Sequence, residues 1–406
     1  MIDKLKICVD LDWNGTIHNV GTLLFNRQRG TEVMSFSYSE KWLSSQIAYE
    51  IDPELPLISG HQYPSSSNFG CFSDAAPDRW GRTLIQRAWA KEGKTRSSLY
   101  ESDYLLGVMD ILRMGAFRFR EHETYLSDRL KGIPKLKNIN EFYHTIENIL
   151  KGGKTAVRDL LDVLGPGSSL GGARPKLTLF DDKGQLFIVK FPNIKHDTID
   201  VPLWEKVCLD LAELCGLNVP PSTLKELPCG KHALIIKRFD RDNEKRIPFA
   251  SAMTLLSAKD SDASGLYSYL DIAEIIASND KNTGKSLTEL WKRMQFNVLI
   301  SNRDDHLRNH GFLRGNLGWE LSPVYDLETD ATSPCHSLSL NASGDCEPDP
   351  NLAISSAQYF GIKEKEAISL TKEMCSIVEK YPNIAKKYGA SGPDIKAMQQ
   401  NFIVRR

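Results

Sequence analysis

The stretch Asn302-Arg303-Asp304-Asp305-His306-Leu307-Arg308-Asn309 is the most informative part of the sequence. Asp304 and Asn309 stand five residues apart within it, and a further aspartate, Asp326, follows in the motif Tyr325-Asp326-Leu327. One carboxylate of such a set can orient an attacking hydroxyl group, while an amide oxygen and a second carboxylate bind Mg²⁺. Each residue alone could belong to a simple turn, but the ordered set favours phosphoryl transfer.

The spacing of these residues is typical of protein kinases, in which a base aspartate precedes a metal-binding asparagine by five residues. A strand-like pair, Gly311–Leu313 and Asn316–Trp319, separates Asn309 from Asp326, as expected for a short hairpin. We therefore predict Asp304, Asn309 and Asp326 as the catalytic residues. Asp304 would be the base, and Asn309 and Asp326 would be the metal ligands.

A glycine-rich segment, Ser168-Ser169-Leu170-Gly171-Gly172-Ala173-Arg174-Pro175-Lys176, precedes two predicted strands, Leu177–Phe180 and Leu186–Lys190. Its backbone N–H groups could form a nest for phosphate oxygens, although such segments are often only turns. Lys190 closes the second strand, so its ammonium either reaches a nucleotide phosphate or extends to solvent. Glu205, which we place in the first turn of the next helix, would pair with Lys190, or would only complement the helix dipole.

Length and composition limit the class of protein. The chain has 406 residues, 41% of them apolar and 25% charged, which is typical of a globular protein with two or three subdomains. The formal net charge of −1 makes no case for direct nucleic-acid binding. The N-terminus lacks a signal-peptide core and no apolar run has membrane-spanning length, so we expect a cytoplasmic protein with no membrane contact.

Patterns that would indicate other chemistry are incomplete. The cysteines form no Cys-x-x-Cys pair, which argues against a disulfide framework or a zinc site and favours a reducing compartment. The Gly-Lys-Ser/Thr triplets at 153–155 and 284–286 lack the first glycine of a P-loop, and His306 and His310 lack the glutamate of a zinc-protease helix. The eight cysteines are Cys8, Cys71, Cys208, Cys215, Cys229, Cys335, Cys346 and Cys375.

The order of predicted strands and helices indicates an α+β fold. An Asn14-Gly15 turn predicts an N-terminal hairpin, and Asp78–Arg96 predicts a basic helix whose charged face is either solvated or binds a partner. A helix over Leu203–Cys215 should stop at Gly216, and Leu287–Ile300 has the clearest helical spacing. We predict an N-terminal subdomain (1–125), a connecting segment (126–159), a sheet-rich ATP-binding lobe (160–240) and a helical catalytic lobe (241–406).

Several motifs along nearly the whole chain resemble those of one family. They are Phe72-Ser73-Asp74-Ala75-Ala76-Pro77-Asp78, Ser169 to Lys176, Gly216-Leu217-Asn218-Val219-Pro220, Arg238-Phe239-Asp240-Arg241, Asn302-x-Asp304-x-His306-x-x-Asn309 and Tyr325-Asp326. On these motifs the sequence resembles the HipA family of bacterial toxin–antitoxin kinases. The resemblance implies a two-lobed, protein-kinase-like fold with an added N-terminal α/β subdomain and a helical C-terminal lobe.

The resemblance also implies an activity, cofactors and partners. It implies an ATP- and Mg²⁺-dependent serine/threonine kinase that phosphorylates a cellular protein, for which aminoacyl-tRNA synthetases are the family's precedent. It implies a HipB-like helix-turn-helix antitoxin as a partner, so that DNA would be bound only indirectly, through the antitoxin. Some family members phosphorylate a serine of their own phosphate loop, and Ser169 matches that serine, with Ser168 beside it.

The resemblance assigns an ATP site to positions of this chain. Lys190 would bind phosphate, and the backbone from Lys237 to Phe239 would contact adenine. The nucleotide-binding set that we predict is Ser169, Leu170, Gly171, Gly172, Ala173, Arg174, Lys176, Lys190, Glu205, Lys237, Arg238, Phe239, His306 and Tyr325.

Two positions depart from the family pattern, and two other functions stay open. Lys237 stands where an acidic residue is familiar, and Arg174-Pro175 adds a charge and a fixed φ to the phosphate loop. A catalytically silent corepressor would bind an antitoxin without turnover, but it would not need the base Asp304. A small-molecule kinase on the same fold is the other alternative, and the large N-terminal subdomain favours a protein substrate instead.

Overall fold

The computed structural model describes residues 3–28, 30–91, 99–127, 134–152, 174–259, 261–262, 265–280 and 282–404. The chain folds into two compact units, and each is discontinuous in sequence. The first unit comprises Met1–Lys195 and Lys237–Ser257, and the second comprises His196–Ile236 and Ala258–Arg406. Each unit contains helices and strands, and in the described part of the chain no helix is both long and apolar enough to span a membrane.

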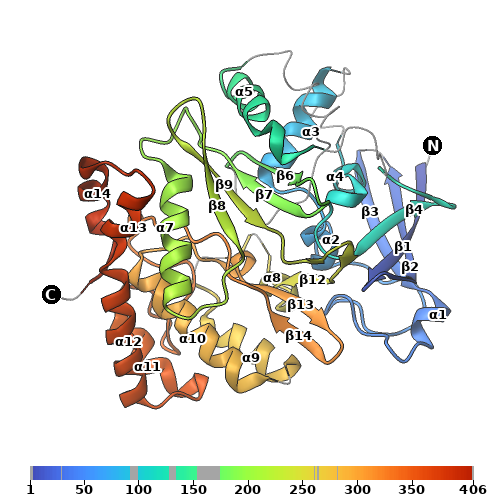
Figure 1. The fold of residues 1–406 in the computed structure, drawn as a ribbon. Helices are drawn as coiled ribbons and strands as arrows, with labels where there is room; N and C mark the ends of the chain where they lie inside the picture. The colour runs from blue at the N-terminus through green and yellow to red at the C-terminus, as the bar shows by residue number, and fades with distance from the viewer. Residues whose placement is uncertain are drawn as a thin grey trace. The chain divides into compact units, whose positions relative to one another are not determined.

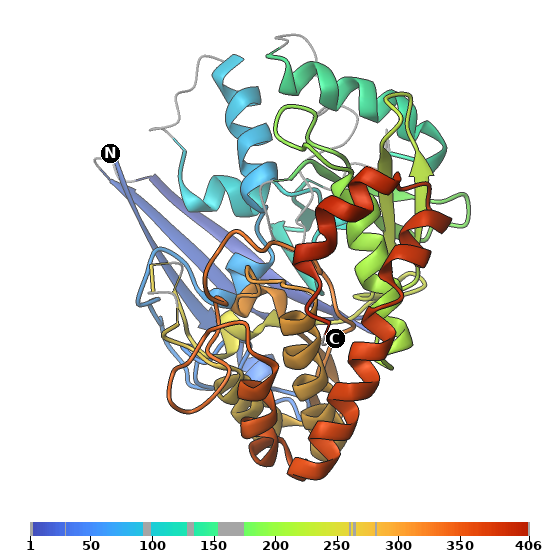
Figure 2. The same ribbon diagram turned by 90° about the vertical axis from the view of Figure 1, so that its left-hand side faces the viewer.

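A five-stranded antiparallel sheet forms the core of the first unit, and its longest strands are blue in Figures 1 and 2. Ile7, Val9 and Leu11 alternate along β1 and are fully buried, as expected for a strand with one face on a core. Asn14 and Gly15 both have positive φ, 53° and 82°, so the predicted hairpin turn is confirmed. In the order β3-β2-β1-β4-β5, the strands are Thr31–Tyr38, Thr16–Gln28, Asp3–Trp13, Phe117–Glu121 and Thr124–Tyr125.

Helices and short strands complete the first unit. The predicted basic helix is α3, and Arg82 on it binds Glu101 through two hydrogen bonds of 2.7 Å, so part of its charge is neutralised. These elements are α1 (Glu40–Leu43), α2 (Gly70–Asp74), α3 (Arg79–Lys91), α4 (Glu101–Gly107), η2 (Asp110–Leu112), η3 (Leu136–Asn138), α5 (Ile139–Leu150), β6 (Lys176–Phe180), β7 (Leu186–Lys190), β10 (Arg241–Asp242), β11 (Lys245–Arg246), β12 (Phe249–Ser251) and α8 (Ala252–Leu255).

Helices dominate the second unit. Its central helix is α10 (Thr283–Leu299), which packs against α9, α11 and α12 (Figure 1). Trp291 and Phe296 on α10 are fully buried, and burial of such side chains contributes roughly 1.5–3 kcal/mol each. The other elements are α7 (Val201–Leu214), β8 (Ser222–Glu226), β9 (His232–Lys237, whose last residue belongs to the first unit), α9 (Tyr269–Asn279), η4 (Leu307–Asn309), β13 (Gly311–Gly315), β14 (Gly318–Leu321), α11 (Pro350–Ser356), η5 (Ala357–Phe360), α12 (Glu364–Val378), α13 (Tyr381–Lys387), α14 (Gly392–Met398) and η6 (Gln399–Asn401).

Helix α7 follows the capping signals of its sequence. Asp200 is the N-cap and accepts a hydrogen bond from the Leu203 backbone N–H, while Pro202 occupies the first turn, where it is tolerated. The helix ends before Gly216, which has a φ of +76°. The predicted stop at this glycine is confirmed.

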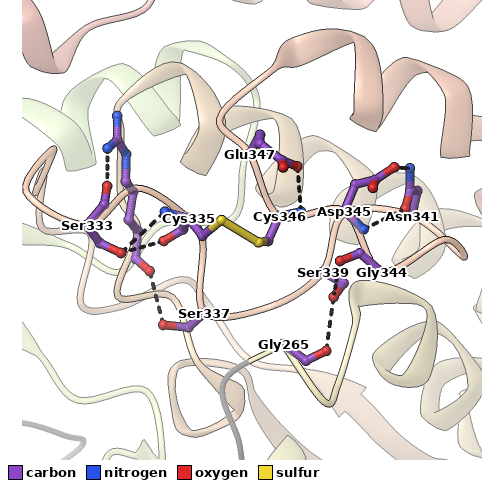
Figure 3. The surroundings of a disulfide bond; sticks show 11 residues. Gly265, Ser333, Cys335, Ser337, Ser339, Asn341, Gly344, Asp345, Cys346 and Glu347 are labelled. Carbon is purple, nitrogen blue, oxygen red and sulfur yellow. Dashed lines mark hydrogen bonds between the residues drawn. A yellow bond between two sulfur atoms is a disulfide. The ribbon is translucent and has the colours of Figure 1, made fainter.

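One pair of cysteines forms a disulfide that the sequence does not predict, since its scattered cysteines argue against a disulfide framework. Cys335 and Cys346 form a disulfide, with 5.0 Å between their Cα atoms (Figure 3). Asn341 turns the chain between them, because its side-chain oxygen accepts hydrogen bonds from the backbone of Ser343 and Asp345. The spacing of the cysteines in the sequence does not reveal this turn, which brings Cys335 close to Cys346.

Candidate functional site

The end of α10 positions the loop that carries Asp304. Ser301 has a φ of +51°, and the Asn302 backbone N–H donates to the Asn297 carbonyl at 2.9 Å. The two asparagine side chains also bind each other, from Asn302 Nδ2 to Asn297 Oδ1 at 3.1 Å. These contacts turn the chain sharply out of the helix, and Asp304 is exposed two residues later.

The side-chain amide of Asn309 has a hydrogen-bond partner at its nitrogen but none among the described residues at its oxygen. Its backbone N–H donates to the His306 carbonyl at 2.8 Å, and its Nδ2 donates to the Asp304 carbonyl at 3.2 Å. Its Oδ1 is buried and has no hydrogen-bond partner among the described residues. A buried carbonyl oxygen without a donor is costly, and a hard cation such as Mg²⁺ would satisfy it.

Asp326 follows the hairpin of β13 and β14. The preceding residue, Tyr325, is buried, and its hydroxyl donates to the Arg308 carbonyl at 2.6 Å. The Val324 N–H donates to the carbonyl of Asn218, in the predicted Gly216–Pro220 motif, at 2.8 Å. Asp326 itself has a φ of +60°, in the left-handed region, which is uncommon for non-glycine residues but in which aspartate is enriched.

The charges around Asp304 are mostly negative. Partial desolvation raises the pKa of Asp304; His306 opposes this rise, whereas Asp326, Asp330 and Glu328 add to it. The described residues contain no group of three His, Cys, Asp or Glu side chains that could hold a metal by itself. Mg²⁺ usually takes only one or two protein carboxylates and completes its shell with water and phosphate.

Asp305, next to Asp304, points into the core instead. Its Oδ2 accepts hydrogen bonds from the Tyr269 hydroxyl, from Asn297 Nδ2 at 2.8 Å and from His310 Nε2 at 2.9 Å. Burial alone would raise the pKa of Asp305, but His310 and these hydrogen bonds lower it below its ordinary value. Asp305 therefore anchors the loop to α9 and α10. Asp305 lies in the Asn302–Asn309 motif and His310 directly follows it, but the motif does not show that these two side chains bind each other.

The predicted phosphate site lies in the first unit and is described only in part. Ser169 to Ala173 fall outside the described residues, and Arg174 is half-buried. Lys176 and Lys190 are both 4% exposed and stand opposite each other in the β6–β7 hairpin. The Lys176 ammonium lies 3.2 Å from the buried Asp78 carboxylate, so a structural partner already balances its charge.

Two predicted nucleotide-binding positions need correction or refinement. Glu205 lies in the second turn of α7 and not in the first, and it is 1% exposed, so the helix dipole does not explain it. Arg238 is buried, and its guanidinium donates to Asp240 at 2.6 Å and to the Leu112 carbonyl at 2.7 Å. Its backbone N–H donates to the Leu186 carbonyl at 3.0 Å. Arg238 therefore stabilises the first unit.

The surroundings of three other predicted nucleotide-binding residues, Lys237, Phe239 and His306, are as follows. Lys237 is the last residue of β9 and is half-buried, and the Phe239 ring packs against Phe249 with 6.3 Å between ring centres. The His306 Nδ1 atom is buried and has no hydrogen-bond partner in the described part of the chain. The second unit thus brings together Asp304, His306, Asn309, Tyr325 and Asp326.

Comparisons with known proteins cover both halves of the chain. The family model of the HipA-like C-terminal domain matches residues 168–381, just over half of the chain, and that of the HipA N-terminal domain matches residues 13–104. The serine/threonine-protein kinase toxin HipA of Shewanella oneidensis is 27% identical over an alignment of 216 residues that covers 46% of this chain and 48% of that protein. A putative kinase of Haemophilus influenzae is 25% identical over an alignment of 193 residues that covers 41% of this chain and 54% of that protein.

The matches therefore span about half the length of these curated relatives. A solved complex of HipA, HipB and operator DNA from Shewanella oneidensis contains a chain with a TM-score of 0.69 and 18% identity. The superposition covers 97% of this chain and 94% of that chain, which confirms the predicted α+β fold of the HipA type. Together with the family match over residues 168–381, these findings show that the chain belongs to the HipA family.

Proposed function

We propose that this chain is an ATP- and Mg²⁺-dependent serine/threonine protein kinase. The observation that carries the proposal is the buried Asn309 Oδ1, which has no donor among the described residues. It belongs to the same unit as Asp304 and Asp326, two carboxylates close enough for one to raise the pKa of the other. A bound cation would remove both the unpaired oxygen and the repulsion.

The residues would divide the work of phosphoryl transfer. Asp304 would accept a hydrogen bond from the substrate hydroxyl and orient it for attack. Asn309 and Asp326 would hold Mg²⁺, which when bound neutralises charge on the phosphates of ATP. Lys190 would bind a phosphate, with Glu205 as its partner, and the backbone at Lys237 and Phe239 would contact adenine.

The biological role proposed is that of a toxin held by a partner. The partner would be a HipB-like helix-turn-helix antitoxin, and DNA would be reached only through it; the solved Shewanella oneidensis complex supports this arrangement. The substrate would be a cellular protein. The chain would also phosphorylate itself at Ser169, where the added charge of about −1.5 to −2 would repel bound ATP and release the loop.

Incubation of the purified chain with γ-labelled ATP and Mg²⁺ tests the activity. We expect label on the chain itself, mapped by mass spectrometry to Ser169, and on a protein band of a bacterial lysate. Asp304→Asn should bind ATP but transfer no label. Label confined to small metabolites would support a small-molecule kinase, and no transfer at all would support a silent corepressor.

A further inference from the structure

The disulfide between Cys335 and Cys346 closes part of the long irregular segment between β14, which ends at Leu321, and α11, which begins at Pro350 (Figure 3). The two cysteines are separated by 11 positions, and both are half-buried. Their chain neighbours Pro334 and Glu347 are both exposed. Their Cα separation of 5.0 Å is within the usual range for disulfides.

The segment closed by this disulfide holds the residues immediately before Asp304. The backbone N–H and the hydroxyl of Ser337 both donate to the Arg303 carbonyl at 3.0 Å. His336 Nδ1 lies 3.1 Å from the Asn302 carbonyl, and burial lowers the pKa of His336 to about 4, so the ring is neutral at pH 7. The His336 backbone N–H donates to the Cys346 carbonyl at 2.8 Å, which couples this contact to the disulfide.

The segment just before Cys335 holds the same loop from another direction. The Arg303 guanidinium donates to the Ala331 carbonyl at 3.0 Å and to the Ser333 carbonyl. The Ser333 hydroxyl in turn donates to the Cys335 carbonyl at 2.8 Å. Residues 331–337 therefore contact the Asp304 loop on both sides of Cys335, and the disulfide limits how far they can move.

We propose that Cys335 and Cys346 are a thiol–disulfide exchange site that controls the order of the loop bearing Asp304. The reactant is a small thiol of the glutathione class. Its thiolate attacks one sulfur, the S–S bond breaks, and the other cysteine leaves as a thiolate. A second small thiol resolves the mixed disulfide, so the two small thiols leave as one disulfide and the protein gains two electrons and two protons. A small disulfide reverses the reaction.

Opening this bond removes a covalent constraint but leaves the hydrogen bonds of His336 and Ser337 possible. Reduction should therefore loosen the loop without unfolding the unit. Since a misplacement of 1 Å can cost roughly 10²-fold in rate, we expect label transfer from ATP to fall by about tenfold on reduction. The effect on activity rests on the proposed kinase function, whereas the effect on loop order does not.

Two states of the full chain test the proposal, one treated with oxidised glutathione and one with dithiothreitol. Alkylation and intact mass should show two more reactive thiols in the reduced state. Hydrogen exchange of peptides covering 301–309 and 330–349 should be faster in that state, and label transfer should be slower. The double variant Cys335→Ser/Cys346→Ser, which leaves no thiol at this site, should show the hydrogen exchange and label transfer of the reduced state under both treatments. Cys229→Ser, which removes an exposed cysteine outside the segment, should respond as the wild type does.

The outcomes separate this proposal from the proposed kinase function. Equal exchange of residues 301–309 in the two states would overturn the proposal, as would failure of the pair to form in oxidised glutathione. If hydrogen exchange differed between the oxidised and reduced states but label transfer did not, the disulfide would not control the activity of the Asp304 loop. Absence of transfer in both states would count against the kinase, and the exchange data would then decide the cysteine proposal alone.

Discussion

Asp304 and Asp305 are adjacent carboxylates in opposite surroundings. Asp304 is exposed as a residue, and partial desolvation of its carboxylate, together with Asp326, Asp330 and Glu328, raises its pKa. Asp305 is 3% exposed and receives three hydrogen bonds on one oxygen, and its pKa is lowered. The protein therefore supplies the partners of Asp305 itself but leaves Asp304 with unfavourable neighbours.

This difference separates the two tasks of a catalytic loop. A residue that positions the loop needs permanent partners, because an unpaired buried charge would destabilise the fold. A residue that acts on substrate must keep its oxygen atoms available, and its unfavourable charge is relieved only when a cation or substrate binds. Substitutions at the two positions should accordingly affect different measurements.

The largest expected effect is on catalysis by Asp304→Asn. The amide keeps the shape of the side chain but cannot act as a base, so label transfer from ATP should fall by roughly 10²–10⁴-fold. The urea unfolding midpoint and the affinity for ATP should stay near the wild-type values. Wild-type transfer by the purified variant would remove Asp304 from the role of base.

Asp305→Ala should act mainly on stability. It leaves the Tyr269 hydroxyl, the Asn297 amide and the His310 ring without their acceptor. We expect a loss of about 3–5 kcal/mol in the free energy of unfolding, as for a buried ion pair that loses one partner. Asp182→Ala, at an exposed position in the β6–β7 turn, is the control and should change stability by less than about 0.5 kcal/mol. Equal stability of the two variants would contradict the anchoring role.

Asp326→Ala should weaken the binding of nucleotide only when Mg²⁺ is present. Loss of a carboxylate ligand should lower the affinity for Mg²⁺–ATP by at least about tenfold, since even outer contacts of a metal are worth 10–100-fold. Calorimetry with ATP, with and without Mg²⁺, measures the effect, and Asp182→Ala again serves as the control. If Asp326→Ala bound Mg²⁺–ATP as tightly as the wild type, the metal site would lie elsewhere.

The pH dependence of unfolding should distinguish Asp304 from Asp305 in the absence of substrate and metal. The lowered pKa of Asp305 adds stability above the unfolded value of about 3.9, and this stability is lost as the pH falls further. The raised pKa of Asp304 has the opposite sign, because proton uptake then favours the folded chain. Between about pH 5 and pH 3, the stability of the metal-free wild type should fall more steeply than that of Asp305→Asn and less steeply than that of Asp304→Asn. The reverse order in urea titrations would contradict both assignments.

The sequence predicts features that depend on neighbouring residues. The Asn14-Gly15 turn and the helix stop at Gly216 follow from local backbone preferences, and the structure has both. The grouping of Asp304, Asn309 and Asp326 follows from a motif whose spacing is itself local. Their catalytic roles stay predictions that the variants above can test.

Features that depend on distant parts of the chain could not be predicted in this way. The donors to Asp305 come from positions 269, 297 and 310, which no periodicity connects. The cysteine pair depends on a turn at Asn341, and the burial of Glu205 depends on how α7 packs. Each of these features arises from tertiary packing, which overrides the local signals of caps and charges.

The mildest substitution removes one donor of the Asp305 group. Tyr269→Phe removes only the hydroxyl, and the ring can keep its edge-to-face contact with His310, whose centre is 5.3 Å away. The hydroxyl also accepts a hydrogen bond from Asn297 Nδ2 at 3.0 Å, but Asn297 and His310 would still donate to Asp305. The loss should therefore be about 1.5–3 kcal/mol, set mainly by the hydrogen bond to the charged carboxylate.

Tyr267→Phe provides a matched control, because its hydroxyl donates to Asp262 at 3.1 Å in a less buried setting. It should cost less than Tyr269→Phe in urea unfolding. Label transfer by Tyr269→Phe should fall by a smaller factor than that of Asp304→Asn, since the loop keeps two of its three anchors. A full loss of label transfer with unchanged stability would instead give Tyr269 a direct role in catalysis. The assignment of catalysis to Asp304 and of anchoring to the Asp305 group would then be wrong.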